Sequence, residues 1–104
     1  MTKLIDEDIT REQFEALDPD TAEMLADALQ ADFAEWGEKL LAAARANDPQ
    51  ALSQARHALK GLCGNFGASA LGKALGEPLD SDIARTALSA MLSATVAAIL
   101  AVAG

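Results

Sequence analysis

The sequence predicts an all-α protein, an up-down antiparallel bundle of the four-helix type that includes a short N-terminal helix. Its 104 residues include 24 alanines, three prolines and no tyrosine, a composition that favours helix over strand. No segment shows the strict apolar-polar alternation of a half-buried strand. Apolar residues instead recur at steps of three and four along three long segments joined by short connections, which predicts mostly antiparallel packing.

A single domain is expected over residues 1–104, because this length suffices for one hydrophobic core and is too short for two. The single cysteine excludes an intramolecular disulfide and suits a reducing compartment. The stretch Met1–Asp8 is polar and acidic, unlike a signal peptide. We therefore expect a cytoplasmic protein.

The first two helices are predicted from their start signals. Thr10 followed by Gln13 matches a capping box, which predicts a short helix from about Arg11 to Leu17. Asp18 followed by Pro19 predicts the start of a second helix, which runs to about Ala46. The apolar stripe of this second helix consists of Leu25, Leu29, Phe33, Trp36, Leu40 and Ala44.

Two further helices complete the predicted bundle. Asp48 and Pro49 predict the start of a third helix that ends near Leu75, with Gly76 as its C-cap. Asp80 or Ser81 opens a fourth helix that runs to about Ala103.

The fourth helix carries no charge from Thr86 to Gly104 and approaches membrane-spanning length. Alanine is its most frequent residue, and its large apolar residues form a stripe rather than a complete apolar surface, so we expect no membrane insertion. A monomer is expected. The small-residue second face of this helix makes a homodimer the alternative.

Charge is distributed unevenly along the chain. The net charge of −8 argues against nucleic-acid binding, which requires a basic surface. Twelve of the sixteen acidic residues lie in the first 38 positions, whereas the segment from Pro49 to Gly76 contains Arg56, Lys60 and Lys73 and no acid. We expect a partner with an acidic pocket to be attracted to this segment.

His57 is the only histidine, and it lies on the predicted third helix. At about 100° per residue, Gly61 and Gly64 lie about +40° and −20° from His57, and Lys60 lies about −60° from it. Gln50, Ser53 and Ala68 lie within about 40° of His57. The apolar residues fall between about 140° and 220° from it; they are Leu52, Ala55, Leu59, Leu62, Phe66 and Ala70. The imidazole is therefore expected to face away from the core.

Gly61 and Gly64 need an explanation, because a glycine inside a helix costs roughly 1 kcal/mol relative to alanine. One explanation is that they keep the surface bare, so that another protein's active site can reach His57 beside the positive charge of Lys60. The alternative is that small residues allow two helices to pack closely. We favour the first, because these glycines surround the histidine and not the buried side of the helix.

The segment resembles a known family. Residues His57, Leu59, Lys60, Gly61, Gly67, Ala68 and Leu71 match the signature of the histidine-containing phosphotransfer (HPt) domains, and the resemblance covers about residues 20 to 75. Leu62 departs from the pattern, since the family usually has a small polar residue there. The resemblance implies a four-helix bundle of the HPt type with His57 exposed near the middle of one long helix.

The resemblance also implies a function in a multistep two-component phosphorelay. His57 is expected to accept a phosphoryl group from the aspartyl phosphate of a receiver domain and to pass it to another receiver. Neutral imidazole is a nucleophile at physiological pH, and Lys60 is expected to stabilise the phosphoryl oxygens. Partner docking is expected at Gly61, Gly64, Gln50, Ser53 and Gln54.

The expected partners are response-regulator receiver domains, a hybrid histidine kinase, or both. No cofactor or metal of its own is expected, because the chain has no nucleotide-binding motif, and Mg²⁺ is expected on the receiver. Kinases that phosphorylate their own histidine typically carry an acid directly after it, where this chain has Ala58. We therefore expect a phosphocarrier and not an enzyme.

Other interpretations of the same residues remain. A helical adaptor could bind and inhibit a receiver or kinase without carrying phosphate, or the histidine could be incidental on a structural bundle. Cys63 lies about 120° from His57 around the helix, so the two cannot form a catalytic pair or share a metal, and Cys63 is expected to be buried. Phe33 and Trp36 are expected to be core residues.

Overall fold

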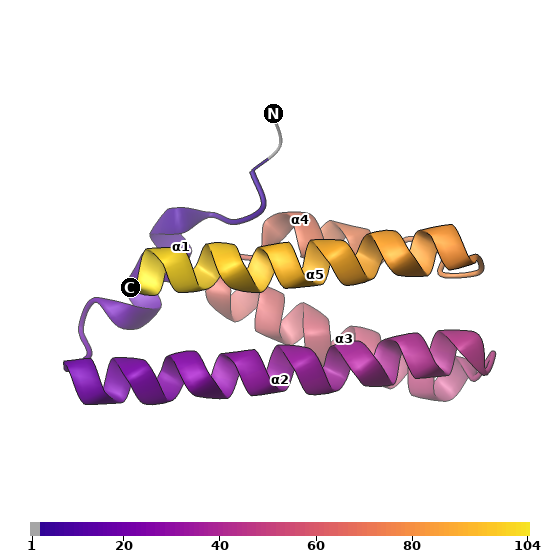
Figure 1. The fold of residues 1–104 in the computed structure, drawn as a ribbon, viewed down its shortest axis with the longest axis horizontal. Coiled ribbons are helices and arrows are strands. Elements are labelled where there is room, and N and C mark those ends of the chain that lie inside the picture. The colour runs from indigo at the N-terminus through magenta and orange to yellow at the C-terminus, as the bar shows by residue number, and fades with distance from the viewer. Residues whose placement is uncertain (1–2) are drawn as a thin grey trace.

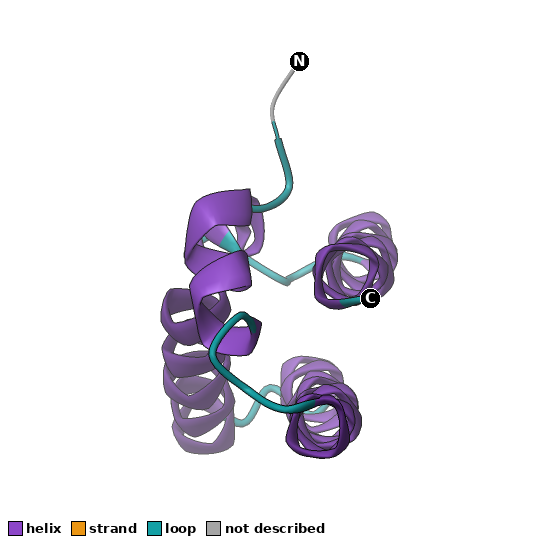
Figure 2. Cartoon of the chain, turned by 90° about the vertical axis from the view of Figure 1, so that its left-hand side faces the viewer, coloured by secondary structure: helices purple, strands orange, loops and turns teal. Residues whose placement is uncertain are grey.

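The computed structural model describes residues 3–104, and all regular secondary structure in that range is α-helical. The prediction of an all-α protein is confirmed. The elements are α1 (Glu7–Phe14), α2 (Pro19–Arg45), α3 (Pro49–Phe66), α4 (Ser69–Ala74) and α5 (Asp82–Ala103). Helices α2 and α5 lie side by side and run in opposite directions, with α3 behind them (Figure 1). Viewed end-on, α2 and α5 form one side of the molecule, and α1 and α3 form the other (Figure 2).

The three long helices begin where the sequence predicts. In each case the residue before the helix is extended and its side-chain oxygen accepts a hydrogen bond from a backbone N–H in the first turn, which satisfies a donor that lacks an intrahelical partner. The hydrogen bond from Thr21 N–H lowers the pKa of the Asp18 carboxyl. The three bonds are Thr21 N to Asp18 Oδ1 at 2.8 Å, Ala51 N to Asp48 Oδ1 at 3.1 Å, and Ala84 N to Ser81 Oγ at 3.1 Å.

The prediction for the short N-terminal helix is wrong in its boundaries. Helix α1 begins at Glu7, four residues before the predicted start, and its N-cap is Asp6, whose Oδ1 accepts from Asp8 N at 3.1 Å. Thr10, the predicted cap, lies inside the helix and is fully buried. Its hydroxyl donates to the carbonyl oxygen of Phe66 at the end of α3. A tertiary contact therefore uses the hydroxyl that the capping-box pattern assigned to the helix terminus.

The third helix ends earlier than predicted, at Phe66 and not near Leu75. Gly67 has φ +74°, the left-handed conformation that commonly ends helices at glycine. A Cβ on Gly67 would lie 2.7 Å from the carbonyl oxygen of Asp6, so the N-terminal segment also requires a glycine there. The chain then turns into the short α4, and Ala68, predicted to share the His57 side, is fully buried instead.

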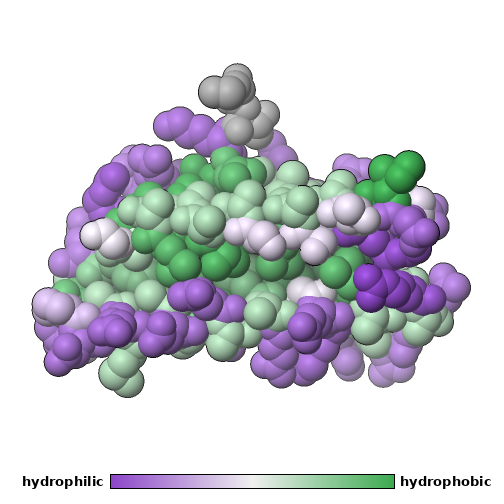
Figure 3. All heavy atoms as spheres, in the orientation of Figure 1, coloured by the Kyte–Doolittle hydropathy of each residue, from purple (hydrophilic) through white to green (hydrophobic). Residues whose placement is uncertain are grey.

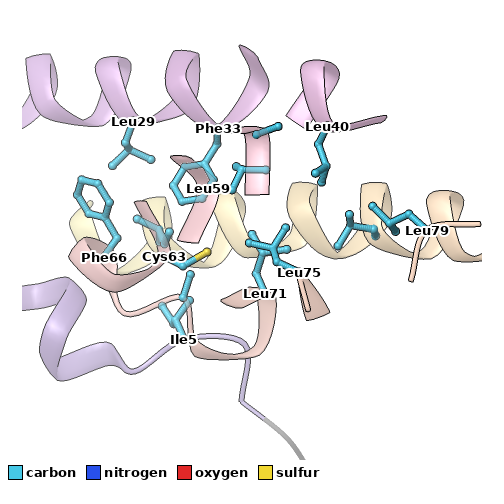
Figure 4. Packing of buried hydrophobic residues seen from close by; sticks show 14 of the residues in the cluster. Ile5, Leu29, Phe33, Leu40, Leu59, Cys63, Phe66, Leu71, Leu75 and Leu79 are labelled. Carbon is cyan, nitrogen blue, oxygen red and sulfur yellow. The ribbon is translucent and has the colours of Figure 1, made fainter. Parts of the chain in front are cut away.

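One buried cluster includes side chains from all five helices of the described chain. Phe33, Leu59 and Cys63 approach one another between α2 and α3 (Figure 4). Phe33 is fully buried as predicted, whereas Trp36 is only half-buried and lies under the Lys39 ammonium at 4.4 Å from the ring centre. Leu62, the departure from the HPt signature, is half-buried and packs against the cluster.

Helix α5 packs on α2 at Gly37, where an added Cβ would lie 2.8 Å from Leu92 Cδ1. By length and composition α5 is the one helix of residues 3–104 able to cross a membrane, with a mean hydropathy of 2.0, and 17% of that apolar window is buried. Such a helix is weak evidence for a membrane span. On the face seen in Figure 3, apolar atoms follow α5 and the groove beside it, while hydrophilic atoms follow the outer edge of α2.

Candidate functional site

His57 lies near the middle of α3 and its side chain is exposed. The opposite side of the helix is held in the core by Ala55, Leu59 and Cys63, all buried. This pairing of an apolar stripe with a polar face fixes the direction in which the imidazole projects. The orientation predicted from helical periodicity is therefore confirmed.

The imidazole has no side-chain hydrogen bond or ion pair among the residues that the structure describes. The hydrogen bonds and ion pairs among residues 3–104 include none to His57. An intramolecular catalytic base or an orienting carboxylate would appear as such a bond. The described residues also contain no cluster of histidine, cysteine and acidic side chains able to hold a metal. The ring nitrogens are left free for a group supplied from outside.

Gly61 and Gly64 are exposed, and a Cβ added at either position would meet nothing within 4 Å. The close packing of two helices therefore does not account for these glycines. Gly37 shows what close packing looks like in this protein, since its added Cβ would collide with Leu92. The two glycines beside His57 instead leave a stretch of bare backbone facing solvent.

The remaining predicted residues all lie exposed on α3. We call the set His57, Lys60, Gly61, Gly64, Gln50, Ser53 and Gln54 the histidine face. Ser53 and Lys60 line a shallow hollow beside His57, whose other walls are Pro49, Leu52 and Arg56. Gln50 and Gln54 lie outside this hollow, as do the two glycines.

Arg56 belongs to the site although the sequence indicated it only as part of a positive segment. It is half-buried and donates from Nη2 to the carbonyl oxygen of Glu77 at 2.9 Å. That contact reaches across to the segment between α4 and α5, so no helical periodicity within α3 predicts it. The sequence feature that could have identified Arg56 as a site residue is its position directly before His57 in a segment without acidic residues.

Cys63 lies on the other side of α3 and is 4% exposed, as predicted. Burial raises the pKa of its thiol to about 11, since a low-dielectric surrounding disfavours the charged thiolate. A thiol in this state is a poor nucleophile and a poor metal ligand at neutral pH. The thiol therefore contributes packing and not chemistry to the histidine helix.

The N-terminal segment holds the C-terminal end of α3 in place. Asp6 N donates to the Gly67 carbonyl at 2.7 Å, and Ala70 N donates to the Leu4 carbonyl at 3.3 Å. Together with the buried bond from the Thr10 hydroxyl, these contacts bind the turn after α3 to the residues before and within α1. They restrain the helix that carries His57 from the end nearest Gly64.

Comparison of the chain with protein-family models, curated proteins and solved structures gives no match. The functional inference therefore depends on the geometry of the histidine face and on its resemblance to the HPt signature.

Proposed function

We propose that this protein is a histidine phosphotransfer protein of a multistep two-component phosphorelay. His57 accepts a phosphoryl group from the aspartyl phosphate of one receiver domain and passes it to an aspartate of another. The observation that carries the proposal is an exposed imidazole that has no partner among residues 3–104. It lies beside a lysine without an ion pair in that range and two glycines that no packing there requires. In this proposal the helices form a four-helix bundle of the HPt type, with α1 as its short N-terminal helix.

The transfer step needs little chemistry from this chain. The lone pair of one imidazole nitrogen attacks phosphorus, an N–P bond forms, and the P–O bond to the donor carboxylate breaks. The carboxylate leaves with the bonding electron pair, while the imidazole keeps its N–H proton and becomes cationic. No base has to remove a proton, which fits the lack of a hydrogen-bond partner for His57 among the described residues.

Lys60 supplies positive charge to the phosphoryl oxygens. It lies three residues after His57, so the two side chains are neighbours on the helix surface, and it makes no ion pair within residues 3–104. An unpaired ammonium is free to follow the phosphoryl group. Catalysis of phosphoryl transfer depends largely on such positioning and charge stabilisation.

The partners in this proposal are receiver domains, a hybrid histidine kinase, or both, which supply the catalytic aspartates and bind Mg²⁺. The carrier itself has no cofactor, acts in the cytoplasm and is a monomer. The acid-free segment around His57 complements the acidic phosphorylation site of such a partner, which favours rapid association.

The experiment that tests the proposal uses radiolabelled phosphoryl groups. Purified receiver domains from the same genome are labelled with radiolabelled phosphoramidate and Mg²⁺ and separated from the remaining phosphoramidate. They are then incubated with this protein or with the variant His57→Gln. The proposal requires acid-labile, base-stable label on the wild-type chain and none on the variant. Binding to a receiver without any label would favour the non-phosphorylated adaptor, and label that persists in His57→Gln would place the acceptor elsewhere.

A further inference from the structure

The hollow beside His57 has polar donors on one side of the imidazole only. Counting about 100° per residue from His57, Ser53, Lys60 and Arg56 lie about −40°, −60° and −100° around the helix. All three line the same hollow as His57. Gly61 and Gly64 lie outside it. We call the hollow with its two cations the cationic flank, and the bare backbone at Gly61 and Gly64, which lies outside the hollow toward the C-terminal end of α3, the bare flank.

Arg56 has unused hydrogen-bonding capacity in this arrangement. A guanidinium carries five N–H donors, and the described residues provide Arg56 with a single acceptor, the Glu77 carbonyl oxygen. Its Nε is buried and has no hydrogen-bond partner among the described residues. No carboxylate forms an ion pair with it among residues 3–104. A buried donor without an acceptor is unfavourable. An anion in the hollow would accept from the guanidinium once the Arg56 side chain turns toward His57, and this turn would also give Nε an acceptor.

Lys60 and Ser53 would bind the same anion as Arg56. Lys60 follows Arg56 by four residues, the spacing that brings side chains together on a helix surface. Their charges repel each other unless an anion lies between them. The Ser53 hydroxyl, four residues before His57, can donate to the same anion. One anionic group bonded to the imidazole would therefore meet two cations and one hydroxyl.

We propose that Arg56 is a further catalytic residue, whose guanidinium contacts the phosphoryl oxygens on His57 together with Lys60 and Ser53. This assignment rests on the proposed phosphotransfer function. The phosphoryl group lies on the cationic flank, and the partner's backbone approaches over the bare flank at Gly61 and Gly64. The N–P bond forms and the donor bond breaks as described above, and Arg56 neutralises charge without gaining or losing a proton.

The test uses phosphoramidate as the donor, because this small molecule has no docking surface. In that reaction the N–P bond of the donor breaks and ammonia leaves. We compare the phosphorylation rate of His57 in the wild type with the rates in Arg56→Gln, Arg56→Lys and Lys73→Gln. Lys73 is exposed on α4 and outside the hollow, so its variant controls for the loss of one positive charge from the same segment.

Arg56→Gln is expected to slow phosphorylation about tenfold or more, the range typical of losing a hydrogen bond to a charged group. Arg56→Lys is expected to recover part of the rate, because it keeps the charge and loses the planar fork. Lys73→Gln is expected to match the wild type. If Arg56 only held the segment around Glu77 in place, its replacement would change the thermal stability and would not produce this order of phosphorylation rates.

The outcomes separate the two proposals. If the wild type is phosphorylated at His57 and Arg56→Gln is phosphorylated at the same rate, the assignment of Arg56 is overturned and the carrier function is not. Wild-type protein that takes no label from phosphoramidate or from any receiver overturns the carrier function and this assignment together. Circular dichroism establishes whether each variant is folded. If Arg56→Gln is not folded, the phosphorylation rate of Arg56→Lys is compared with that of the wild type instead.

Discussion

Replacing both Gly61 and Gly64 with alanine is expected to stabilise this protein. Each glycine lies inside α3 with its missing side chain pointing to open solvent, so an added Cβ meets nothing within 4 Å. Alanine is favoured over glycine in a helix interior by about 1 kcal/mol, mainly because it restricts the unfolded chain. Since neither Cβ disturbs a neighbour, the double variant should gain about 2 kcal/mol, or roughly 8 °C in Tm for a domain of this size.

The assay is urea unfolding followed by far-UV circular dichroism, with thermal unfolding as a second measure. Gly67→Ala is the matched control on the same helix end. Its φ of +74° and a Cβ 2.7 Å from the Asp6 carbonyl oxygen should make it destabilising by more than about 1 kcal/mol. A double variant that is no more stable than the wild type would refute the view that no packing requires these two glycines.

A related prediction concerns the effect of Gly61→Gln on receiver binding. Glutamine is a better helix former than glycine, so this variant should unfold at a higher urea concentration than the wild type. Its longer side chain would cover the bare flank, and receiver binding should weaken while phosphorylation by phosphoramidate persists. Ala90→Gln, at an exposed position on α5, controls for the added side chain. Unchanged receiver binding by Gly61→Gln would contradict the docking role of the glycines.

Two further predictions concern single side chains. Lys60→Ala should slow transfer from a phosphorylated receiver about tenfold. The free energy of unfolding should change by no more than about 0.5 kcal/mol, because Lys60 is exposed and makes no ion pair within residues 3–104. Transfer at the wild-type rate would remove Lys60 from the site. Cys63 in the folded protein should react with iodoacetamide far more slowly than in urea, since its thiol is 4% exposed and its pKa is raised to about 11. The thiol of the unfolded chain has a pKa near 9.0 and therefore loses its proton at lower pH than the thiol of the folded protein. The contribution of Cys63 to the free energy of unfolding is thus fully present below pH 9 and should be lost as the pH rises toward 11. Cys63→Ala should lack this component, and equal pH dependence in the two proteins would contradict it.

The starts of the long helices could be predicted because their signals are local. Asp18, Asp48 and Ser81 each cap a backbone N–H only three residues away, so the pattern and the bond lie in the same few residues. The side of α3 from which the His57 imidazole projects could be predicted for a similar reason. The periodic burial of Ala55, Leu59 and Cys63 fixes the opposite face.

The errors occur where distant segments meet. Thr10 has the sequence context of a cap, yet its hydroxyl bonds to Phe66, 56 residues away, and Asp6 takes over the cap. The break after α3 depends on Gly67 accommodating the N-terminal segment. The role of Arg56 likewise depends on the carbonyl of Glu77, 21 residues away. Periodicity along one helix contains no information about such contacts.

The most direct test of the proposed function is the location of the phosphoryl group after transfer. The protein is incubated with a phosphorylated receiver and Mg²⁺, and tandem mass spectrometry under neutral conditions identifies the modified residue. The account predicts one phosphoryl group per chain, located on His57 and removed when a second, unphosphorylated receiver is added. A chain that stays unmodified with every receiver of the genome, or that carries the group on any other residue, would contradict it.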